Sequence, residues 1–285
     1  MGARVSSWLA AHDPVGRVRL SRRSAVGLTL VVYAGIFGPG VYEAIVLSRG
    51  GDQGGDAGID LTGTVVALTC DALVALVAGL AVIRGLVGSW RPVTGAGVTT
   101  WRREIVAGSL CTVLATGSSL LMPLLPTRSY PFDTSGAGQL TDFVGFIRTG
   151  PVEEICALLA PLIILRAGRV SWPVVFALLV AIRLSYHVYY GPGVVFMALW
   201  AFGTVIVYLW ARSIIGIAIA HSLLDLTGLP VDFGHVGIAV LLRVPFVLAC
   251  LGVSIRALWL LRRRRRTALQ DAAFPAPVLP PPPAD

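Results

Sequence analysis

Long apolar stretches constrain this chain most strongly, because each can cross a membrane as a helix of about 20 residues. Only 13% of the 285 residues are charged, about half of the roughly 25% in an ordinary soluble domain. So few charges cannot coat a soluble globule of this size. The sequence therefore predicts an all-α, polytopic membrane helical bundle with about eight transmembrane helices. The eight stretches cover residues 25–48, 62–88, 104–125, 142–165, 171–190, 193–211, 213–229 and 236–261.

The basic residues are all arginine, and they give the chain a formal net charge of +8. They do not form a patch on which nucleic acid would bind. They gather in the links between the apolar stretches and in one cluster, Arg262–Arg266. Such clusters usually mark the cytoplasmic ends of membrane helices and meet anionic lipid. We therefore expect membrane lipids, and not nucleic acid, as partners.

The arginines also predict the orientation of the bundle. Arginine-rich segments precede the first stretch and follow the second, fourth, sixth and eighth, whereas the first link carries three aspartates and one arginine. Because cytoplasmic links are rich in arginine, both termini are predicted to be cytoplasmic in a multi-pass protein of the plasma membrane. Tryptophans that favour the membrane interface lie at the same ends: Trp90, Trp101, Trp172, Trp210 and Trp259.

The apolar stretches form one domain between two tails. Residues 1–23 are expected to be a cytoplasmic N-terminal tail, and residues 24–261 the transmembrane domain. Residues 262–285 are basic and then proline-rich, and we expect a disordered cytoplasmic tail there, because proline does not continue a helix. The four cysteines lie inside apolar stretches without metal-binding spacing, so we expect free thiols.

Ionisable residues in the fourth to seventh stretches conflict with their apolar surroundings. Such a residue at membrane depth costs about 2.5–3.5 kcal/mol, and it needs a partner or a water-filled cavity. In the other stretches we expect Glu43 near an outer end, and structural polar contacts for Asp71 and Arg243. The candidate functional set is Glu153, Glu154, Arg183, His187, His221 and Asp225.

The candidate residues lie at similar depths. With a rise of about 1.5 Å per residue, Glu153 and Asp225 lie roughly 20 Å from the cytoplasmic edge, His221 about 14 Å and His187 about 24 Å. Helix boundaries are uncertain by several residues, and within that error the four residues share one layer. Three helices are therefore expected to converge on a polar pocket inside the bilayer.

The spacings along the chain predict which side chains share a helix face. His221 and Asp225 are four residues apart, as are Arg183 and His187, so each pair points from one face of its helix. The two adjacent glutamates diverge by about 100°, so only one of them can point straight into the pocket. Two carboxylates this close disfavour joint ionisation, which suits a general base that must later donate a proton.

A cluster of carboxylates and histidines at membrane depth is typical of two kinds of chemistry. It can activate a water molecule for attack on a peptide carbonyl, with or without zinc. It can also carry protons or cations through a bundle. A carrier would usually show repeat symmetry or broken helices, and only the first stretch has such a break, at Gly38-Pro39-Gly40.

The order of these residues resembles a known family. Glu153-Glu154, then His187, then His221-Ser-Leu-Leu-Asp225 resemble the EExxxR, FxxxH and HxxxN/D motifs of the CPBP family. That family comprises the type II CAAX prenyl endopeptidases and their bacteriocin-processing or immunity relatives. The match covers about residues 151–228, within a predicted protease core at 142–229. The resemblance implies an intramembrane protease of several helices.

The resemblance also implies roles for the matching residues. Glu153 would activate the attacking water, with Glu154 beside it in the catalytic set, and His187 would help to hold the water. His221 and Asp225 would position it or stabilise the oxyanion. The family has been described both with and without an essential metal, so a zinc ion held by Glu153, His187, His221 and Asp225 stays open. An ionised aspartate cannot donate to an oxyanion, so Asp225 would act as a ligand, as an orienter of His221, or in its protonated form.

Two positions depart from the family pattern. The arginine of EExxxR is replaced by Leu158, and the phenylalanine of FxxxH by Arg183. One hypothesis is that Arg183 supplies the guanidinium lost from the fourth helix, in which case Arg183→Phe combined with Leu158→Arg would restore a protein damaged by Arg183→Leu. The alternative is that Arg183 simply neutralises a buried carboxylate.

The sequence thus favours an integral-membrane endopeptidase whose substrate is a membrane-associated peptide or protein, lipidated or not. A catalytically silent scaffold or immunity-type protein is the first alternative, favoured by the two departures. A proton or cation carrier is the second. The sequence leaves the metal, the substrate and the oligomeric state open.

Overall fold

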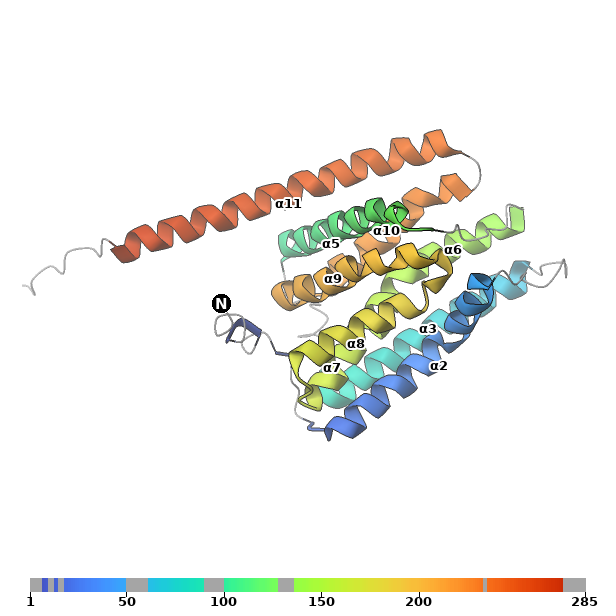
Figure 1. The fold of residues 1–285 in the computed structure, drawn as a ribbon, viewed down its shortest axis with the longest axis horizontal. Coiled ribbons are helices and arrows are strands. Elements are labelled where there is room, and N and C mark those ends of the chain that lie inside the picture. The colour runs from blue at the N-terminus through green and yellow to red at the C-terminus, as the bar shows by residue number, and fades with distance from the viewer. Residues whose placement is uncertain are drawn as a thin grey trace, which may run out of the picture.

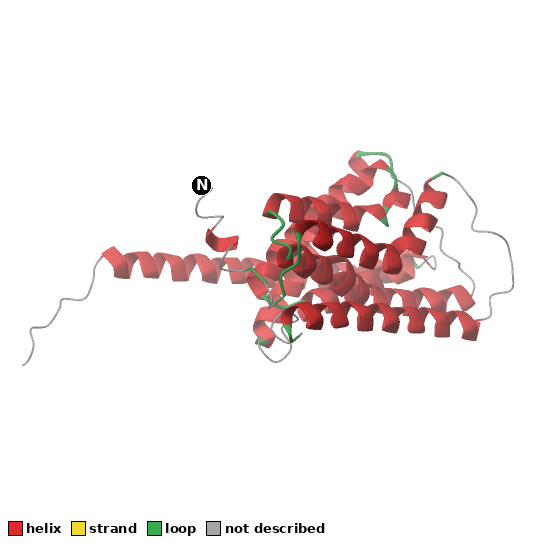
Figure 2. Ribbon diagram, turned by 90° about the horizontal axis from the view of Figure 1, so that it is seen from below, coloured by secondary structure: helices red, strands yellow, loops and turns green. Residues whose placement is uncertain are grey.

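The computed structural model describes residues 7–9, 13–14, 18–49, 61–89, 100–127, 136–232 and 235–273, and this part of the chain is helical with no strand (Figures 1 and 2). The predicted all-α class is therefore confirmed. The α-helices of the bundle are α2 (Arg22–Ser48), α3 (Leu61–Val87), α5 (Trp101–Leu121), α6 (Gly136–Val152), α7 (Ala160–Ala167), α8 (Trp172–Ser185), α9 (Met197–Ala211), α10 (Ile215–Asp232) and α11 (Val236–Ala273).

Each of the eight apolar stretches forms helix. Five helical segments in the described ranges are long and apolar enough to cross a membrane. Two further apolar helices are shorter, Trp172–Ser185 and Ile215–Gly228. The chain therefore has the helices of a multi-pass membrane protein. The five long segments are Arg22–Val46, Val66–Val87, Trp101–Leu124, Pro192–Ala211 and Val236–Arg263.

Short irregular helices interrupt the bundle at two places. A π-helical turn, Glu153–Leu159, joins α6 to α7 without a break in the helix. Two 3-10 turns, Val188–Tyr190 and Pro192–Phe196, join α8 to α9. The expected helix at 171–190 therefore ends early, because α8 stops at Ser185. A π turn inside a helix often marks a functional site.

The arginine-rich helix ends gather on one side. The first turn of α2 and the last turn of α7 lie at the same end of the bundle, and α11 runs toward that end and projects past it (Figure 1). The helix α7 lies in the interior: all of its residues except Arg166 are buried. A helix that is apolar on every side is expected in such a central position.

The C-terminal tail begins with more helix than expected, and part of the N-terminal segment packs on the bundle. Helix α11 continues to Ala273, so the start of the tail expected to be disordered, residues 262–273, is helical. Arginine, alanine and leucine favour helix, and Pro275 follows only after its end. At the other terminus, Leu9 is buried in the main core and Asp13 forms an ion pair with Arg166. The proline-rich part of the tail, 274–285, lies outside the described residues.

Close backbone contacts hold α10 between α5 and α6. A Cβ atom on Gly150 of α6 would lie 2.1 Å from the carbonyl oxygen of Ala218, and one on Gly216 of α10 would lie 2.2 Å from that of Glu104. Only glycine allows such approaches, as is common between membrane helices. The Glu104 side chain also accepts a hydrogen bond of 2.8 Å from the Gly216 N–H at the start of α10. The position of α10 along both neighbours is therefore fixed.

A proline adds a side-chain bond between α6 and α10. Pro151 has no N–H, so the carbonyl of Ile147, four residues earlier, loses its usual partner within the helix. The hydroxyl of Ser222 on α10 donates to that carbonyl at 2.9 Å. On α10 this contact is made by the residue that directly follows His221. On α6 it lies within two turns before Glu153 and Glu154.

Candidate functional site

Five of the six candidate residues meet in one cluster inside the bundle. Glu153 and Glu154 begin the π turn, Arg183 lies in the last turn of α8, and His221 and Asp225 project from one face of α10. Ion pairs connect all five side chains. The prediction that charged residues from three helices converge inside the bundle is therefore correct for this set.

Arg183 connects the two glutamates. Its Nη1 donates to Glu153 Oε2 at 2.8 Å, and its Nη2 donates to Glu154 Oε1 at 2.6 Å. The Arg183 side chain is only 3% exposed, and its guanidinium carbon lies 4.4 Å from the ring centre of Trp200. Charge pairing and cation–π contact together satisfy a cation that the apolar bundle would otherwise exclude.

Glu154 fixes the orientation of His221. The Glu154 side chain is fully buried, and its Oε1 lies 2.9 Å from His221 Nδ1. Because a carboxylate only accepts, Nδ1 carries the proton in this bond. The other ring nitrogen, Nε2, then lies 3.5 Å from Asp225 Oδ2 and 4.0 Å from Glu153 Oε2. The imidazole is thus held in one tautomer, with Nε2 on the side of Glu153 and Asp225.

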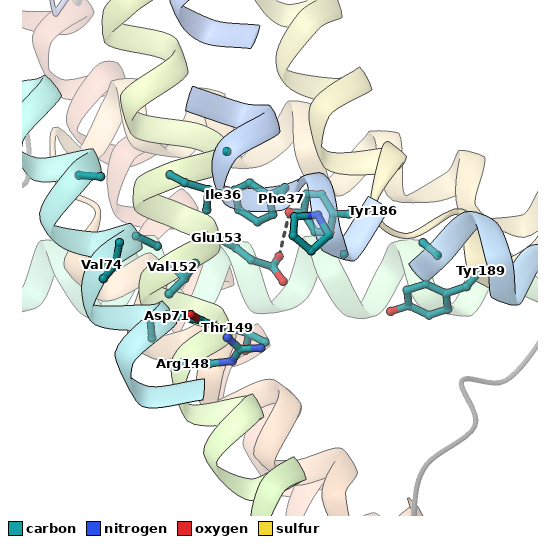
Figure 3. A pocket seen from close by; sticks show the side chains of 17 residues that line it. Ile36, Phe37, Asp71, Val74, Arg148, Thr149, Val152, Glu153, Tyr186 and Tyr189 are labelled. Atoms are coloured by element: carbon teal, nitrogen blue, oxygen red, sulfur yellow. Dashed lines mark hydrogen bonds between the residues drawn. The ribbon is translucent and has the colours of Figure 1, made fainter. Parts of the chain in front are cut away.

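Glu153 lines a cavity of about 560 Å³ between α2, α3, α6 and the turn after α8. Figure 3 shows its carboxylate directed into this space, with Tyr186 donating to Oε2 at 2.9 Å. Within the described part of the chain, Oε2 takes the bonds from Arg183 and Tyr186, and Oε1 has no protein partner. Glu154 lines a separate small cavity instead. This agrees with the expectation that only one of the adjacent glutamates faces the pocket.

The cavity wall also contains polar residues that are not in the predicted set. Asp71, expected to make a structural contact, lines the cavity from α3, while Arg148 and Thr149 line it from α6 (Figure 3). The hydroxyl of Thr149 donates to Asp225 Oδ2 at 2.8 Å. The cavity wall also includes Tyr189 and six residues of α2: Gly35, Ile36, Phe37, Pro39, Gly40 and Ala44. The space therefore reaches from the middle of the bundle toward the ends that lack arginine clusters.

His187 is the candidate that stands apart. Because α8 ends at Ser185, His187 lies in a turn, with φ −111° and ψ 8°, and it does not extend the helix face of Arg183 as predicted. Its Nδ1 lies 2.8 Å from the Arg183 carbonyl oxygen, and its ring stacks on Tyr190 with centroids 6.0 Å apart. Within the described ranges, no hydrogen bond joins its side chain to either glutamate.

The cluster does not fit a zinc site. Zinc in proteins takes three or four closely grouped N, O or S ligands, and no group of three such side chains among the described residues could hold a metal ion. The guanidinium of Arg183 already pairs with both glutamates, so its charge would repel a divalent cation there. The ligand set suggested by the sequence, Glu153, His187, His221 and Asp225, is therefore not assembled.

Sequence reasoning missed three contributors to the cluster. Tyr186 and Thr149 are ordinary residues of an apolar helical region, and only the fold brings their hydroxyls to Glu153 and Asp225. Trp200 had a usable signal: it lies inside an apolar stretch, whereas the tryptophans of an interfacial belt lie near stretch ends. Its ring packs on Arg183 and, edge to face, on His221 with centroids 4.9 Å apart.

Comparisons of the chain with known protein families, with curated proteins and with solved structures find no match. The resemblance to the CPBP motifs therefore remains a prediction.

Proposed function

We propose that this protein is an intramembrane endopeptidase resembling the CPBP proteases. In this proposal the eight apolar helices cross the plasma membrane with both termini in the cytoplasm, and the substrate is a membrane-associated peptide or protein, lipidated or not. The observation that carries the proposal is Glu153: a carboxylate at the wall of a large cavity within an apolar bundle, beside a histidine and an aspartate.

Glu153 is the general base of the proposed reaction. Its Oε1 takes a proton from a water molecule in the cavity as the water oxygen attacks the carbonyl carbon of the peptide bond. Arg183 and Tyr186 hold Oε2 throughout, so the carboxylate keeps its direction. When the tetrahedral intermediate collapses, the C–N bond breaks and the proton on Glu153 passes to the departing amine.

In the proposed reaction His221 stabilises the intermediate, because its Nε2 lies 4.0 Å from Glu153 Oε2. When both of its ring nitrogens carry protons, Nε2 can donate toward the developing oxyanion. Glu154 holds Nδ1, and Asp225 lies close enough to Nε2 to favour the positive charge of the ring. In this arrangement Asp225 orients His221, which is the role that an ionised aspartate can fill. The proposed reaction proceeds without a metal.

The cavity supports access from the middle or outer part of the membrane. Its α2 wall lies in the half of that helix farther from Arg22, and its α6 wall ends at Val152, directly before Glu153. A peptide segment lying within the membrane, or entering from the non-cytoplasmic side, would therefore reach the base without crossing the arginine-rich ends.

The proposal is tested with purified protein in detergent against lipidated and unlipidated peptides. General-base catalysis contributes about 10²–10⁴-fold, so Glu153→Gln is expected to lower the cleavage rate by about that factor while the protein still folds. Asp71→Asn is the matched control, because Asp71 lines the same cavity without contacting the cluster. Cleavage by Glu153→Gln at the rate of the unmodified protein would exclude Glu153 as the base.

The second candidate is a catalytically silent membrane scaffold. It is favoured by the two ion pairs of Arg183, which engage an oxygen of each glutamate as a purely structural cluster would. This candidate predicts no cleavage of any peptide by the unmodified protein, together with a large loss of stability when Arg183 is removed. Cleavage that depends on Glu153 would exclude it.

A further inference from the structure

A second, much smaller cavity is lined by Glu154 and shares no lining residue with the large one. Its volume is about 10 Å³, and it is enclosed by side chains of α5, α9 and α10 together with Glu154. A space of roughly 10–15 Å³ holds one water molecule when polar groups face it. Two residues of its wall, Glu154 and Thr112, each have a buried polar atom without a hydrogen-bond partner among the described residues.

The first is the second oxygen of Glu154. Oε1 is held by Arg183 and His221, whereas Oε2 is buried without a hydrogen-bond partner among the described residues. The residue has no exposed surface. An ionised carboxylate accepts several hydrogen bonds, and buried polar atoms in folded proteins almost always have a partner.

The second is the hydroxyl of Thr112 on α5. The residue is 1% exposed, and its Oγ1 has no partner in the described part of the chain. Buried threonines in helices usually donate to the carbonyl four residues earlier. Thr204 on α9 does so, to Trp200 at 2.9 Å. The Thr112 hydroxyl does not make that bond, which leaves it available to the cavity.

We propose that this cavity binds one water molecule, which donates to Glu154 Oε2 and shares a hydrogen bond with Thr112 Oγ1. The volume, the two polar atoms and their complete burial all fit a single bridging water. A cation fits less well, because Arg183 already balances the charge of Glu154 from the other side.

The bound water makes Thr112 a positioning residue. It fixes the plane of the Glu154 carboxylate, and that carboxylate in turn holds Nδ1 of His221. The site is distinct from the water that Glu153 is proposed to activate, because the two glutamates line different cavities. The water site therefore stands whether or not the protein hydrolyses peptides.

The direct test is a structure of the full chain in lipid, at a resolution that shows ordered water, for three proteins: unmodified, Thr112→Ser and Thr112→Val. We expect density within hydrogen-bond distance of Glu154 Oε2 in the unmodified protein and in Thr112→Ser, and its loss or displacement in Thr112→Val. An unmodified structure with no density there, or with Thr112 bonded directly to Glu154, overturns the proposal.

Thermal unfolding in detergent gives a second readout. Thr112→Val keeps the shape and removes the hydroxyl, so we expect its melting temperature to fall by about 2–4 °C and Thr112→Ser to recover it. Thr116→Val is the matched control, because Thr116 lies one turn along α5 and does not line the cavity, and its hydroxyl likewise has no partner in the part of the chain that the structure describes. Equal effects of the valine changes at the two positions would contradict the proposal. If Thr112→Val fails to fold, the structures of the unmodified protein and of Thr112→Ser still test the proposal through the presence or absence of the water density.

Infrared spectroscopy reports on the carboxylate itself. The carboxylate stretch that disappears in Glu154→Gln is expected to shift in Thr112→Val and to stay in place in Thr116→Val. A band of protonated carboxylic acid that disappears in Glu154→Gln would show that a proton, and not a water, satisfies Oε2.

Discussion

Removal of the Arg183 guanidinium is the most direct test of the buried cluster. Arg183→Leu leaves two carboxylates inside an apolar bundle without the cation that pairs with both. Removing one partner of a buried ion pair typically costs about 3–5 kcal/mol, because the remaining charge stays buried and unpaired. Here one arginine serves two glutamates, one of them with no exposed side chain.

The expected loss follows from these contacts. Loss of the ion pairs is expected to lower the free energy of unfolding by about 3–5 kcal/mol. The contact with the Trp200 ring, 4.4 Å from the guanidinium carbon, adds about 0.5–2 kcal/mol. Together these contributions give a loss of about 3.5–7 kcal/mol, and a loss of about 5 kcal/mol shifts the folding equilibrium by several thousandfold, at about 1.4 kcal/mol per factor of ten.

The assay is reversible unfolding in mixed detergent micelles, followed by tryptophan fluorescence. The triple change Arg183→Leu, Glu153→Gln and Glu154→Gln is the matched control, since it removes the two uncompensated charges along with the cation. We expect the triple variant to recover most of the lost stability, because replacing a whole ion-pair network by neutral groups is often tolerated. Arg183→Lys should recover only part of it, since one ammonium cannot match the fork geometry of a guanidinium.

Two outcomes would refute this reasoning. One is an Arg183→Leu protein whose free energy of unfolding lies within about 1 kcal/mol of the unmodified value, the range of an exposed ion pair. The other is a triple variant no more stable than the single one, which would mean that packing of Arg183, and not its charge, holds the cluster.

Three further predictions use simpler changes. Gly150→Ala is expected to destabilise the bundle by at least about 1–3 kcal/mol, since its Cβ would meet the Ala218 carbonyl, whereas Gly145→Ala, with open space around it, should be neutral in the same unfolding assay. A metal chelator is expected to leave any peptide cleavage unchanged, and loss of cleavage that zinc restores would contradict a metal-free site. Arg183→Phe combined with Leu158→Arg tests the guanidinium swap: recovery of stability relative to Arg183→Leu supports it, and continued loss removes it.

The helices were predictable because burial in lipid and burial in protein both demand apolar side chains. Each stretch chosen for its apolar length forms helix, and five helical segments in the described ranges are long and apolar enough to cross a membrane. The cluster was predictable because a charged side chain inside an apolar stretch is costly unless it has a partner. Counting depth along each helix therefore located Glu153, His221 and Asp225 well enough to expect contact between them.

Helix ends and irregular turns were not predictable at the same level. The apolar run continues through Val188 and beyond, so nothing in its composition stops α8 at Ser185. Because the helix stops there, His187 leaves the face that it would share with Arg183 and bonds the Arg183 carbonyl instead. Apolar content likewise could not predict that α11 continues through the basic cluster to Ala273, since helix propensity and not hydropathy decides that end.

The adjacency of Gly150 and Pro151 to the two glutamates explains how the cluster is kept in register. Glycine lets the α10 backbone approach, and proline frees a carbonyl for Ser222, so α6 and α10 are fastened to each other one turn from His221 and Asp225. The π turn that follows changes the direction of the side chains after Val152. Within the short run Gly-Pro-Val-Glu-Glu, Gly150 and Pro151 allow the contacts that position α10. The next residues but one, Glu153 and Glu154, supply the carboxylates that lie beside His221 of α10. The glycine substitution should accordingly weaken the pairing of Glu154 with His221, although Gly150 touches neither residue.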